Sequence, residues 1–468
     1  MAQINSDFFW QAATWADWLG CELRGDKEAY IYGVTTDSRT TRPGDAYFAV
    51  IGERFDGHDF AEAAVENGAS VLVVNRLLDL PVTQLVVDDT RLALGQVAKQ
   101  HRLSQPLHKL IAVTGSNGKT TVKTMLAHIL GMQAPTLATQ GNLNNDFGVP
   151  RTLLEIRPHH RYAVIEMGAN HLGEIGYLTQ LGCPDVAMIT LAADAHLEGF
   201  GSLQGIIDTK GEIFNGLTAE GIGIINTDSP GYEQWQASLS EHPIWRFGRA
   251  EAADVRVLDV QSQDKGLVFS LSLKGEKVEA TLPVMGVHNA MNAAAATAAC
   301  LAIGLTWAQI QPALATFTGV QGRLQTYELQ DEKLQSNALL IDDSYNANPS
   351  SVMAAMDTLS TRPGYRVFCL GQMAELGDLA EHKHYEVGEY AKQKGIDCLL
   401  TYGDLTAASQ KGFGAQTAVM SHEQMIERLA EILVQYPEVN ILIKGSRSAQ
   451  MERVVQGVLA RFKHAHLS

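Results

Sequence analysis

The chain has 468 residues, of which 46% are hydrophobic and 19% are charged. This composition is typical of globular proteins and excludes an extensively disordered chain. Its length corresponds to about three domains of ordinary size. The formal net charge of -16 argues against a nucleic-acid partner or an anionic membrane surface, because those partners favour clustered lysine and arginine. Anionic ligands must therefore be met by local positive side chains.

Cysteine usage and the first residues suggest neither secretion nor membrane insertion. The five cysteines are odd in number, scattered, and spaced neither as C-x-x-C nor as zinc ligands. No basic segment followed by an apolar stretch opens the sequence, so no signal peptide is apparent. The most apolar segment, Ala293 to Leu305, is too short to span a bilayer. We expect reduced thiols, a cytoplasmic location, no membrane insertion, and a monomer.

Residues 1–108 alternate short β-rich runs with helical periodicities. The predicted helices are Phe8–Leu19, Phe60–Asn67 and Arg91–Leu103, and the predicted strands are Tyr47–Val50, Val71–Val74 and Leu85–Val87. Polar turns between these elements carry side chains that suit a phosphorylated ligand, namely Ser38, Arg39, Asp56 and His58. The alternative is that such residues cap helices and shape turns, which is their commoner role.

A glycine loop follows the predicted linker Ser104–Leu107. The apolar run Leu110–Val113 predicts a strand, Thr114–Thr121 forms the loop, and helical spacing begins after it. Backbone N–H groups in such a loop, together with the positive end of the helix dipole, suit phosphate oxygens. Lys119 adds a cation for the β- and γ-phosphates, and a hydroxyl of Thr120 or Thr121 can ligate Mg²⁺.

The loop is a shortened form of the general phosphate-loop pattern, because Gly115 precedes Gly118 by only three residues. The alternative is a plain turn between a strand and a helix. An amide-rich loop follows, containing Asn142 and Asn145, and it indicates either a set of turns or a surface for a polar ligand.

Glu166 ends the predicted strand Tyr162–Ile165. A carboxylate at the carboxyl end of a parallel strand lies where open α/β sheets bind ligands, although a solvated strand end is the alternative. The next predicted strand, Asp185–Thr190, leads to His196 and to a helix carrying Lys210. A loop histidine and a helix lysine do not by themselves indicate a site.

A strand at Ile222–Ile225 and an irregular β-rich stretch to Leu282 come next, followed by an alanine-rich helix. Asn289 and Asn292 share one face of that helix and could contact a nucleotide base, or Asn289 could cap the helix. From about residue 324, polar sequences follow three predicted strands, Leu339–Ile341, Arg366–Leu370 and Ile441–Ile443. This alternation predicts a Rossmann-like sheet with one polar rim.

Several of these motifs, in this order, resemble the Mur ligase family of ATP-dependent amide-forming enzymes. They are Thr114–Thr121, Glu166, His196, Lys210, Asn289 with Asn292, Arg323, and Asp343-Ser344. The resemblance implies an α/β protein of three domains: residues 1–108 for a UDP-sugar-peptide, a central ATPase with a mostly parallel sheet at 109–322, and a Rossmann-like domain at 323–468. It implies ATP and Mg²⁺ as cofactors, and UDP-N-acetylmuramoyl-tripeptide and D-Ala-D-Ala as substrates.

The resemblance also implies roles for single residues. Phosphates would lie on Gly115, Ser116, Asn117, Gly118 and Lys119, with Arg323 at the γ-phosphate. Adenine would contact Asn289 and Asn292, and the ribose Asp343. One Mg²⁺ would bind Thr120 or Thr121 with Glu166, and a second would lie near Glu166, His196 and carbamylated Lys210. Substrate contacts would come from Ser38, Arg39, Asp56, His58, Asn142, Asn145, Tyr345, Asn346, Asn348, Lys444, Ser446 and Arg447.

The expected reaction joins a carboxylate to an amine through an acyl phosphate, which explains the need for cations around two anions. One position departs from the family, which commonly has an acid where this chain has Gln372. The rival interpretations are a sister ligase with another acceptor, a folate-polyglutamate-type ligase, and a non-catalytic nucleotide switch. The switch would have no use for Glu166, His196 and Lys210 together.

Overall fold

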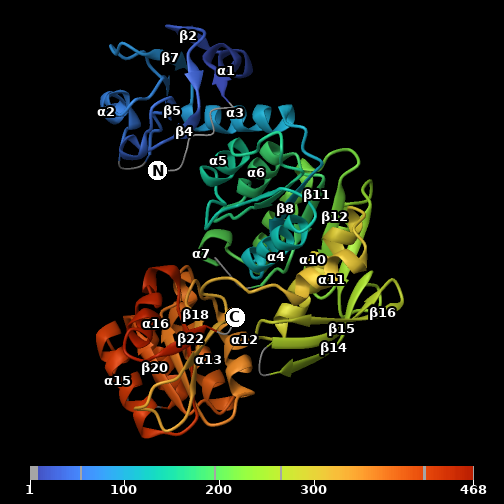
Figure 1. The fold of residues 1–468 in the computed structure, drawn as a ribbon, viewed down its shortest axis with the longest axis vertical. Helices are drawn as coiled ribbons and strands as arrows, with labels where there is room; N and C mark the ends of the chain where they lie inside the picture. The colour runs from blue at the N-terminus through green and yellow to red at the C-terminus, as the bar shows by residue number, and fades with distance from the viewer. Residues whose placement is uncertain (1–8, 53–54, 194–196, 264–265, 415–417, 467–468) are drawn as a thin grey trace.

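A computed structural model describes residues 9–52, 55–193, 197–263, 266–414 and 418–466. The chain forms three α/β regions in sequence order, each built on its own main sheet, and Figure 1 shows them as blue, green-yellow and orange-red parts. The predicted fold class is confirmed. His196 lies outside the described residues, so its predicted role is not addressed by the structure.

The N-terminal sheet has the strand order β2-β7-β6-β5-β4, with β2 antiparallel to β7 and the other pairs parallel. A two-stranded ribbon joins β1 to β3. The strands are β1 (Trp10–Gln11), β2 (Glu22–Arg24), β3 (Tyr30–Ile31), β4 (Gly33–Thr35), β5 (Asp45–Phe48), β6 (Val71–Val74) and β7 (Thr83–Val86), and the helices are α1 (Ala12–Leu19), α2 (Ala61–Glu66) and α3 (Thr90–Ser104).

Several boundaries in this region differ from the sequence-based prediction: β5 and β7 each begin two residues earlier, and α2 is one residue shorter at each end. Two further differences have a clear physical reason. The first helix begins at Ala12 rather than Phe8, because Trp10 and Gln11 are extended and pair with Ile31 and Tyr30. The predicted linker begins inside α3, which runs to Ser104. The arginine and histidine side chains of that last turn suit the negative end of the helix dipole, which favours continuation of the helix.

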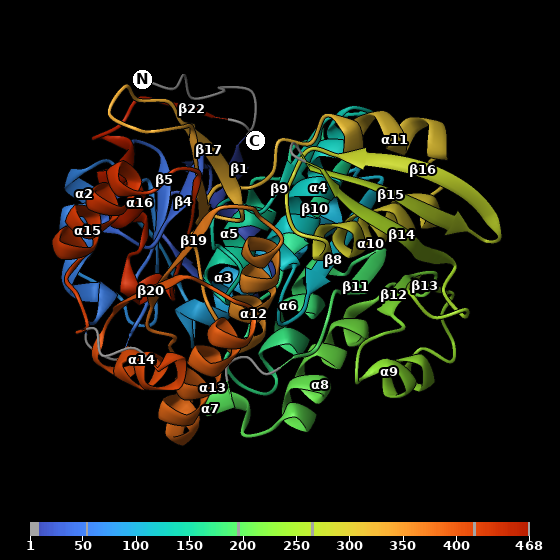
Figure 2. The same ribbon diagram turned by 90° about the horizontal axis from the view of Figure 1, so that it is seen from below.

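The central sheet has nine strands in the order β16-β15-β14-β13-β12-β11-β8-β10-β9. The strands from β14 to β9 pair in parallel, and β14, β15 and β16 form an antiparallel edge that extends to one side in Figure 2. The strands are β8 (Lys109–Thr114), β9 (Thr136–Ala138), β10 (Tyr162–Glu166), β11 (Val186–Ile189), β12 (Ile222–Asn226), β13 (Ile244–Gly248), β14 (Val255–Gln263), β15 (Gly266–Leu273) and β16 (Glu276–Leu282).

The buried faces of the central helices explain how this sheet is covered. The alanines of α10 are buried and share one core with apolar residues of α4 and of β8. Their small side chains let the two helices lie close to each other. The helices are α4 (Lys119–Gly131), α5 (Gly148–Leu154), α6 (Glu174–Gly182), α7 (Leu197–Phe200), α8 (Leu203–Gly211), α9 (Tyr232–Ser238), α10 (His288–Ala302) and α11 (Trp307–Ala315).

The C-terminal sheet has the order β20-β19-β21-β18-β17-β22, with β17 antiparallel to both of its neighbours. The predicted final helix, α16, is followed by β22, a strand that a His-Ala-His sequence does not signal. The elements are β17 (Gln325–Leu329), β18 (Ala338–Asp343), α12 (Pro349–Ser360), β19 (Tyr365–Gly371), α13 (Ala380–Gln393), β20 (Cys398–Tyr402), α14 (Ala407–Phe413), α15 (His422–Gln435), β21 (Val439–Lys444), α16 (Glu452–Leu459) and β22 (His464–His466).

Two further observations bear on the class of protein. All five cysteines are unpaired in the structure. Among the described residues, no helix combines the length and the apolar character needed to cross a bilayer. The apolar segment singled out in the sequence forms most of α10, a buried helix of the central region.

Candidate active site

The phosphate loop connects β8 to α4, and steric constraints explain why glycine occupies two of its positions. Gly115 has φ of 148°, and a Cβ atom there would lie 1.9 Å from Thr190 Oγ1. Gly118 has φ of 83°, and its Cβ would lie 2.6 Å from Asn292 Oδ1. Both backbone conformations favour glycine, and both positions let the chain pass close to neighbouring polar groups. A plain turn would not need this double constraint.

Lys119 opens α4 and lies over the loop that precedes it. Its Nζ donates hydrogen bonds to the carbonyl oxygens of Gly115 and Ser116. Burial lowers the pKa of Lys119, Glu166 raises it, and Arg323 lowers it again. Lys119 is half-buried and lines the large cleft described below, so its ammonium group is partly desolvated and attracts a phosphate oxygen more strongly than it would in bulk water.

Glu166 ends β10 and is 2% exposed. Its Oε1 accepts hydrogen bonds from Asn144 Nδ2 at 2.8 Å and from Thr120 Oγ1 at 3.4 Å, whereas Oε2 is buried without a hydrogen-bond partner. A buried carboxylate oxygen without a partner is costly, and a hydroxyl oxygen beside it supplies a second hard ligand. This donor set fits Mg²⁺ held between the protein and phosphate oxygens.

The described residues contain no group of three or more histidine, cysteine, aspartate or glutamate side chains arranged to hold a metal. A magnesium ion at Glu166 would therefore take most of its ligands from phosphates and water, as Mg²⁺ commonly does. Thr121 lines the nucleotide cavity described below, whereas Thr120 contacts the carboxylate. The geometry favours Thr120 over Thr121 as the metal-binding hydroxyl.

Lys210 lies in the last turn of α8, which begins where Ser202 Oγ accepts a hydrogen bond from the Gly205 amide. The lysine is 1% exposed, and its Nζ is 5.3 Å from the centroid of the Phe200 ring. Burial, and then the charge of Lys119, lower the pKa of Lys210 to about 7. A large fraction of this amine is neutral near pH 7, which makes it a nucleophile.

A cavity of about 210 Å³ lies between α10 and the start of the C-terminal region. It brings together seven of the predicted nucleotide residues, which are Asn117, Gly118, Thr121, Asn289, Asn292, Arg323 and Asp343. Asn289 does not cap α10: its Nδ2 donates to the Met285 carbonyl at 2.7 Å, and its Oδ1 accepts from Asn292 Nδ2 at 2.7 Å. The capping alternative is therefore excluded.

Lys444 also lines this cavity, although the sequence assigned it to the substrate. The lysine is 1% exposed, and its Nζ donates to Asp343 Oδ2 at 2.6 Å and to the Asn346 carbonyl at 2.9 Å. Burial lowers the pKa of Lys444, and the Asp343 carboxylate opposes that shift. Lys444 thus fixes the carboxylate that we expect at the ribose.

Arg323 joins the cavity to a larger cleft, because it lines both. Its guanidinium carbon is 4.5 Å from the centroid of the Tyr345 ring, a cation–π arrangement. The Nε atom is buried and has no hydrogen-bond partner among the described residues. An arginine held on one face with a free donor suits an anion such as the γ-phosphate.

Asn117 links the phosphate loop to the C-terminal region. Its Nδ2 donates to Ser350 Oγ at 2.9 Å, its Oδ1 accepts from Asn348 Nδ2 at 2.8 Å, and Ser350 Oγ donates to Asn348 Oδ1 at 3.0 Å. Asn348 is at the same time the N-cap of α12. These three side chains form a closed ring of hydrogen bonds, named here the Asn117 ring, across the boundary between the two regions.

The larger cleft has a volume of about 1510 Å³ and contains the phosphate loop, Glu166 and residues of all three regions. Predicted substrate residues from the central and C-terminal parts reach it, namely Asn142, Asn145, Tyr345, Asn346, Asn348 and Arg447. Asn145 Oδ1 also accepts a hydrogen bond from the Gly148 amide, at the first residue of α5. Ser446 does not line the cleft; its hydroxyl donates to the Gln372 carbonyl at 2.7 Å.

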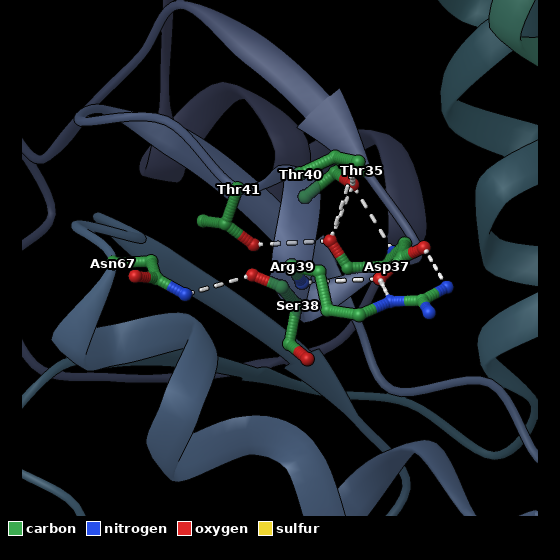
Figure 3. A network of polar contacts seen from close by, with 7 residues as sticks. All are labelled: Thr35, Asp37, Ser38, Arg39, Thr40, Thr41 and Asn67. Carbon is green, nitrogen blue, oxygen red and sulfur yellow. Dashed lines mark hydrogen bonds and ion pairs between the residues drawn. The ribbon is translucent and has the colours of Figure 1, made fainter.

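The predicted substrate residues of the N-terminal sheet do not line the cleft. Figure 3 shows Arg39 turned toward Asp37, with hydrogen bonds of 2.9 and 2.7 Å, while the Ser38 carbonyl accepts from Asn67. The Ser38 hydroxyl points away from this network. His58 Nδ1 is 2.6 Å from Asp56 Oδ1, and its Nε2 accepts from the Asn75 amide.

Some residues of the cleft were not predicted. Asn144, between two asparagines that were, contacts Glu166, and Ser350 completes the Asn117 ring. Arg91 lines the far wall of the cleft from the first turn of α3. The sequence indicated Asn144 only as one member of the amide-rich loop. No local pattern distinguishes Ser350 and Arg91 from residues at ordinary helix ends.

Comparisons with known proteins agree with this geometry. Family models match residues 30–102 (Mur ligase family, catalytic domain), 113–300 (Mur ligase middle domain) and 322–447 (Mur ligase, glutamate ligase domain). The UDP-N-acetylmuramoyl-tripeptide--D-alanyl-D-alanine ligase of Escherichia coli (strain K12) is 44% identical over 443 residues, which cover 94% of this chain and 96% of the relative.

Two solved structures are similar along most of their length. MurF from Acinetobacter baumannii has a TM-score of 0.91 at 36% identity, with 97% of this chain and 99% of that chain covered. MurF ligase from Thermotoga maritima in complex with ADP has a TM-score of 0.79 at 25% identity, with 91% and 96% covered. Together with the phosphate loop and its surroundings, these matches show that the chain belongs to the Mur ligase family.

Proposed function

We propose that this protein is an ATP-dependent ligase that joins D-alanyl-D-alanine to UDP-N-acetylmuramoyl-tripeptide and releases ADP and phosphate. The observation that carries this proposal is the set of groups around one cleft: a cation on the phosphate loop, a buried carboxylate with an unpartnered oxygen, and an arginine with a free donor. The name of the E. coli relative supports the choice of substrates.

The reaction needs both anions neutralised before they meet. The terminal carboxylate of the tripeptide attacks the γ-phosphorus of ATP, and the bond from that phosphorus to the β,γ-bridging oxygen breaks. ADP is released, and the tripeptide now carries an acyl phosphate. Lys119 and Arg323 reduce the repulsion between the two anions and stabilise charge on the transferring phosphoryl group. Glu166, with Thr120, would hold Mg²⁺, which supplies further charge neutralisation on the phosphate oxygens.

The second step forms the amide. The amine of D-Ala-D-Ala attacks the acyl carbon, the tetrahedral intermediate expels phosphate, and the amine loses a proton. Arg447 lies on the C-terminal wall of the cleft and is 67% exposed at its side chain, so it can receive the dipeptide carboxylate. The acyl phosphate hydrolyses readily, so water must be kept from it, and we expect closure of the C-terminal region over the cleft to do this.

Lys210 has a proposed role as a carbamate. Its amine, about half of it neutral at pH 7, can add to carbon dioxide, which forms an N–C bond and releases a proton, so that a side chain that is otherwise an ammonium becomes an anion. A carbamate near Glu166 would serve a cation, together with His196, whereas an ammonium would repel it. We further propose the domain limits 1–108, 109–322 and 323–468, a monomer and a cytoplasmic location, which the five unpaired cysteines support.

The test is phosphate release from ATP with UDP-N-acetylmuramoyl-tripeptide, with and without D-Ala-D-Ala, alongside mass spectrometry of the product. We expect release that needs both substrates and a product heavier by the dipeptide residue. Release that does not depend on the dipeptide, with no new amide, would leave the nucleotide site intact and contradict this acceptor. A rise in melting temperature with folates but not with the UDP-tripeptide would favour a folate-polyglutamate-type ligase.

A further inference from the structure

A buried histidine holds the loop that follows β19 in the C-terminal region. His384 lies in α13 and is fully buried. The Met373 amide donates to its Nε2 atom at 3.0 Å, and its Nδ1 atom is 2.7 Å from the Ala380 carbonyl oxygen. Because an amide N–H only donates and a carbonyl only accepts, the ring must carry its proton on Nδ1. Burial also lowers the pKa of His384, against the bond to Ala380, so the ring is neutral at pH 7.

The loop from Met373 to Gly377 is anchored by its apolar residues and turns the residues between them toward the large cleft. Met373 and Leu376 are buried in one core with apolar residues of β19 and α13. Ala374 and Glu375 line the cleft, and Glu375 is exposed. His384 therefore fixes the first residue of a loop whose tip faces the reaction site.

Glu375 has a backbone conformation that favours glycine. Its φ is 62°, in the left-handed region that residues with a Cβ atom rarely adopt. Glycine or asparagine adopts this conformation at a lower cost. Strained residues of this kind gather at functional sites, where the surrounding structure holds them in place. The strain at Glu375 thus points to a use for its carboxylate rather than for the turn alone.

The Glu375 carboxylate acts on the phosphate-loop side of the cleft, although it belongs to the C-terminal region. Burial lowers the pKa of Lys119, the Glu166 carboxylate raises it, and the Glu375 carboxylate also raises it. The short 3₁₀ helix Gly377–Leu379, which follows the loop, lies against α7 of the central region. Figures 1 and 2 both place α7 beside the C-terminal region. The loop is therefore a point where the two regions meet at the cleft.

The acceptor in the proposed reaction is a zwitterion, so it needs a cation at one end and an anion at the other. Arg447 and Glu375 offer these charges from loops that follow the neighbouring parallel strands β21 and β19. The loops are tied together, because the amide and the hydroxyl of Ser446 donate to the Gln372 carbonyl at 3.2 and 2.7 Å. A dipeptide spans at most about 7 Å and neighbouring strands lie about 4.8 Å apart, so both loops can reach its ends.

We propose that His384 is a positioning residue for the acceptor: by accepting from the Met373 amide, it holds the loop so that Glu375 faces the amine of the incoming dipeptide. Glu375 would bind the ammonium group and take the proton that must leave before the nitrogen attacks. The nitrogen then forms its bond to the acyl carbon, the bond from that carbon to the phosphate oxygen breaks, and the second proton leaves with phosphate. This inference rests on the proposed function and assigns residues to its second step.

The test offers two nucleophiles to the same acyl phosphate, formed from ATP and UDP-N-acetylmuramoyl-tripeptide. D-Ala-D-Ala needs the Glu375 carboxylate, whereas hydroxylamine, a small and largely neutral amine at pH 7, traps the acyl phosphate as a hydroxamate without it. His384→Leu leaves the Met373 amide without an acceptor and should lower kcat/KM for D-Ala-D-Ala by about tenfold or more. Hydroxamate formation, and its KM for ATP, should stay within about twofold of wild type. His384→Gln offers an oxygen to the same amide and should restore most of the loss.

Two further variants separate positioning from stability. The Ser409 hydroxyl donates to the His384 carbonyl at 2.8 Å, between α14 and α13, so Ser409→Ala removes a buried hydrogen bond and leaves the Met373 contact in place. As the matched control, it should melt below wild type and keep the wild-type kcat/KM for D-Ala-D-Ala. Glu375→Asn tolerates the left-handed backbone, so it should melt no lower than wild type and yet lose about tenfold in kcat/KM for the dipeptide.

Each outcome decides the inference. Equal losses with the dipeptide and with hydroxylamine in His384→Leu, or a glutamine variant as impaired as the leucine variant, would overturn it. Should His384→Leu fail to fold, Glu375→Asn takes its place, and unchanged dipeptide kinetics in that variant would overturn the role of the loop. Wild-type kinetics in every variant would leave the proposed function standing, whereas wild-type protein that forms neither hydroxamate nor amide overturns the proposed function itself.

Discussion

The phosphate-loop end of the cleft and the polar turns of the N-terminal sheet were both predicted to hold phosphorylated ligands, but their side chains are arranged differently. At the phosphate loop, Glu166 Oε2 and Arg323 Nε are buried without hydrogen-bond partners. In the N-terminal turns, Arg39 is paired with Asp37 and His58 with Asp56. The first arrangement leaves donors and acceptors for a ligand, and the second satisfies them internally.

This difference separates a site from a set of turns better than residue type does. Buried polar atoms without partners cost free energy in the isolated protein, so they persist where a ligand completes them. Exposed pairs such as Asp37 with Arg39 carry no such cost and shape the turn in which they lie. The predictions below test whether function follows this difference in hydrogen bonding.

The largest effect is expected at Lys119. Lys119→Ala removes the half-buried cation of the phosphate loop and should lower kcat by on the order of a hundredfold or more, as the loss of preorganised electrostatic stabilisation does. The measurement is ATP-dependent phosphate release with both other substrates present. Lys411→Ala, an exposed lysine at the end of α14, is the control and should retain wild-type turnover. Near-normal turnover of Lys119→Ala would remove the phosphate loop from the mechanism.

The second effect is expected at Lys210. Lys210→Ala should lose most activity and regain part of it when small carboxylic acids are added, because they replace the anionic end of a carbamate. Titration of added acids against phosphate release provides the measurement, with Lys119→Ala as the variant that these acids should not rescue. No recovery over a broad range of acids would count against the carbamate.

The pKa of Lys210 also predicts a pH dependence with a definite sign. Its pKa is about 7 in the folded protein, so the neutral fraction of the amine, which reacts with carbon dioxide, falls from about one half at pH 7 to about one tenth at pH 6. Wild-type protein that has been freed of carbon dioxide should therefore recover activity with added bicarbonate at pH 8 and much less at pH 6. Recovery that does not change with pH would contradict a reaction at this amine.

The sequence predicts the central region well, because its elements carry strong local signals. The phosphate loop, the strand ending at Glu166 and the helix of Asn289 and Asn292 are confirmed as elements, and the loop contacts Glu166 through Thr120 and lines one cavity with the two asparagines. What the sequence could not show is pairing between distant segments. The contact of Asn117 with Ser350 joins residues 233 positions apart, and no local pattern encodes it.

The same limit explains the other differences. Lys444 was assigned to the substrate through the family resemblance, and that assignment stays a prediction; its pairing with Asp343 on the neighbouring strand follows from the strand order of the sheet, which no local pattern shows. The start of α1 was placed too early, because the pairing of Trp10 with Ile31 overrides a continuous helical periodicity. Local propensity decides which elements form, and tertiary pairing decides their ends and partners.

A third effect of intermediate size is expected at the Asn117 ring. Asn117→Ala and Ser350→Ala each remove hydrogen bonds between the phosphate loop and α12, and each should lower kcat/KM for ATP by about fivefold, which corresponds to about 1 kcal/mol. A double-mutant cycle gives the coupling, and we expect the double variant to lose less than the product of the single losses. Strictly multiplicative losses would show that the two side chains act separately.

The smallest effect is expected at Arg39, a predicted substrate residue whose side chain is 86% exposed. Its guanidinium lowers the pKa of Asp37 to about 2, so the pair stays ionised above pH 4 and is lost only as the pH falls through about 2. Because Asp37 already neutralises it, Arg39→Ala should raise KM for the UDP-tripeptide by less than about fivefold and equally at pH 6 and pH 9. The comparison variant is Arg76→Ala, which removes the arginine that pairs with Asp56 as Arg39 pairs with Asp37. A rise of a hundredfold for Arg39 alone would mean that the ligand displaces Asp37, and that an internally satisfied pair can still be a binding site.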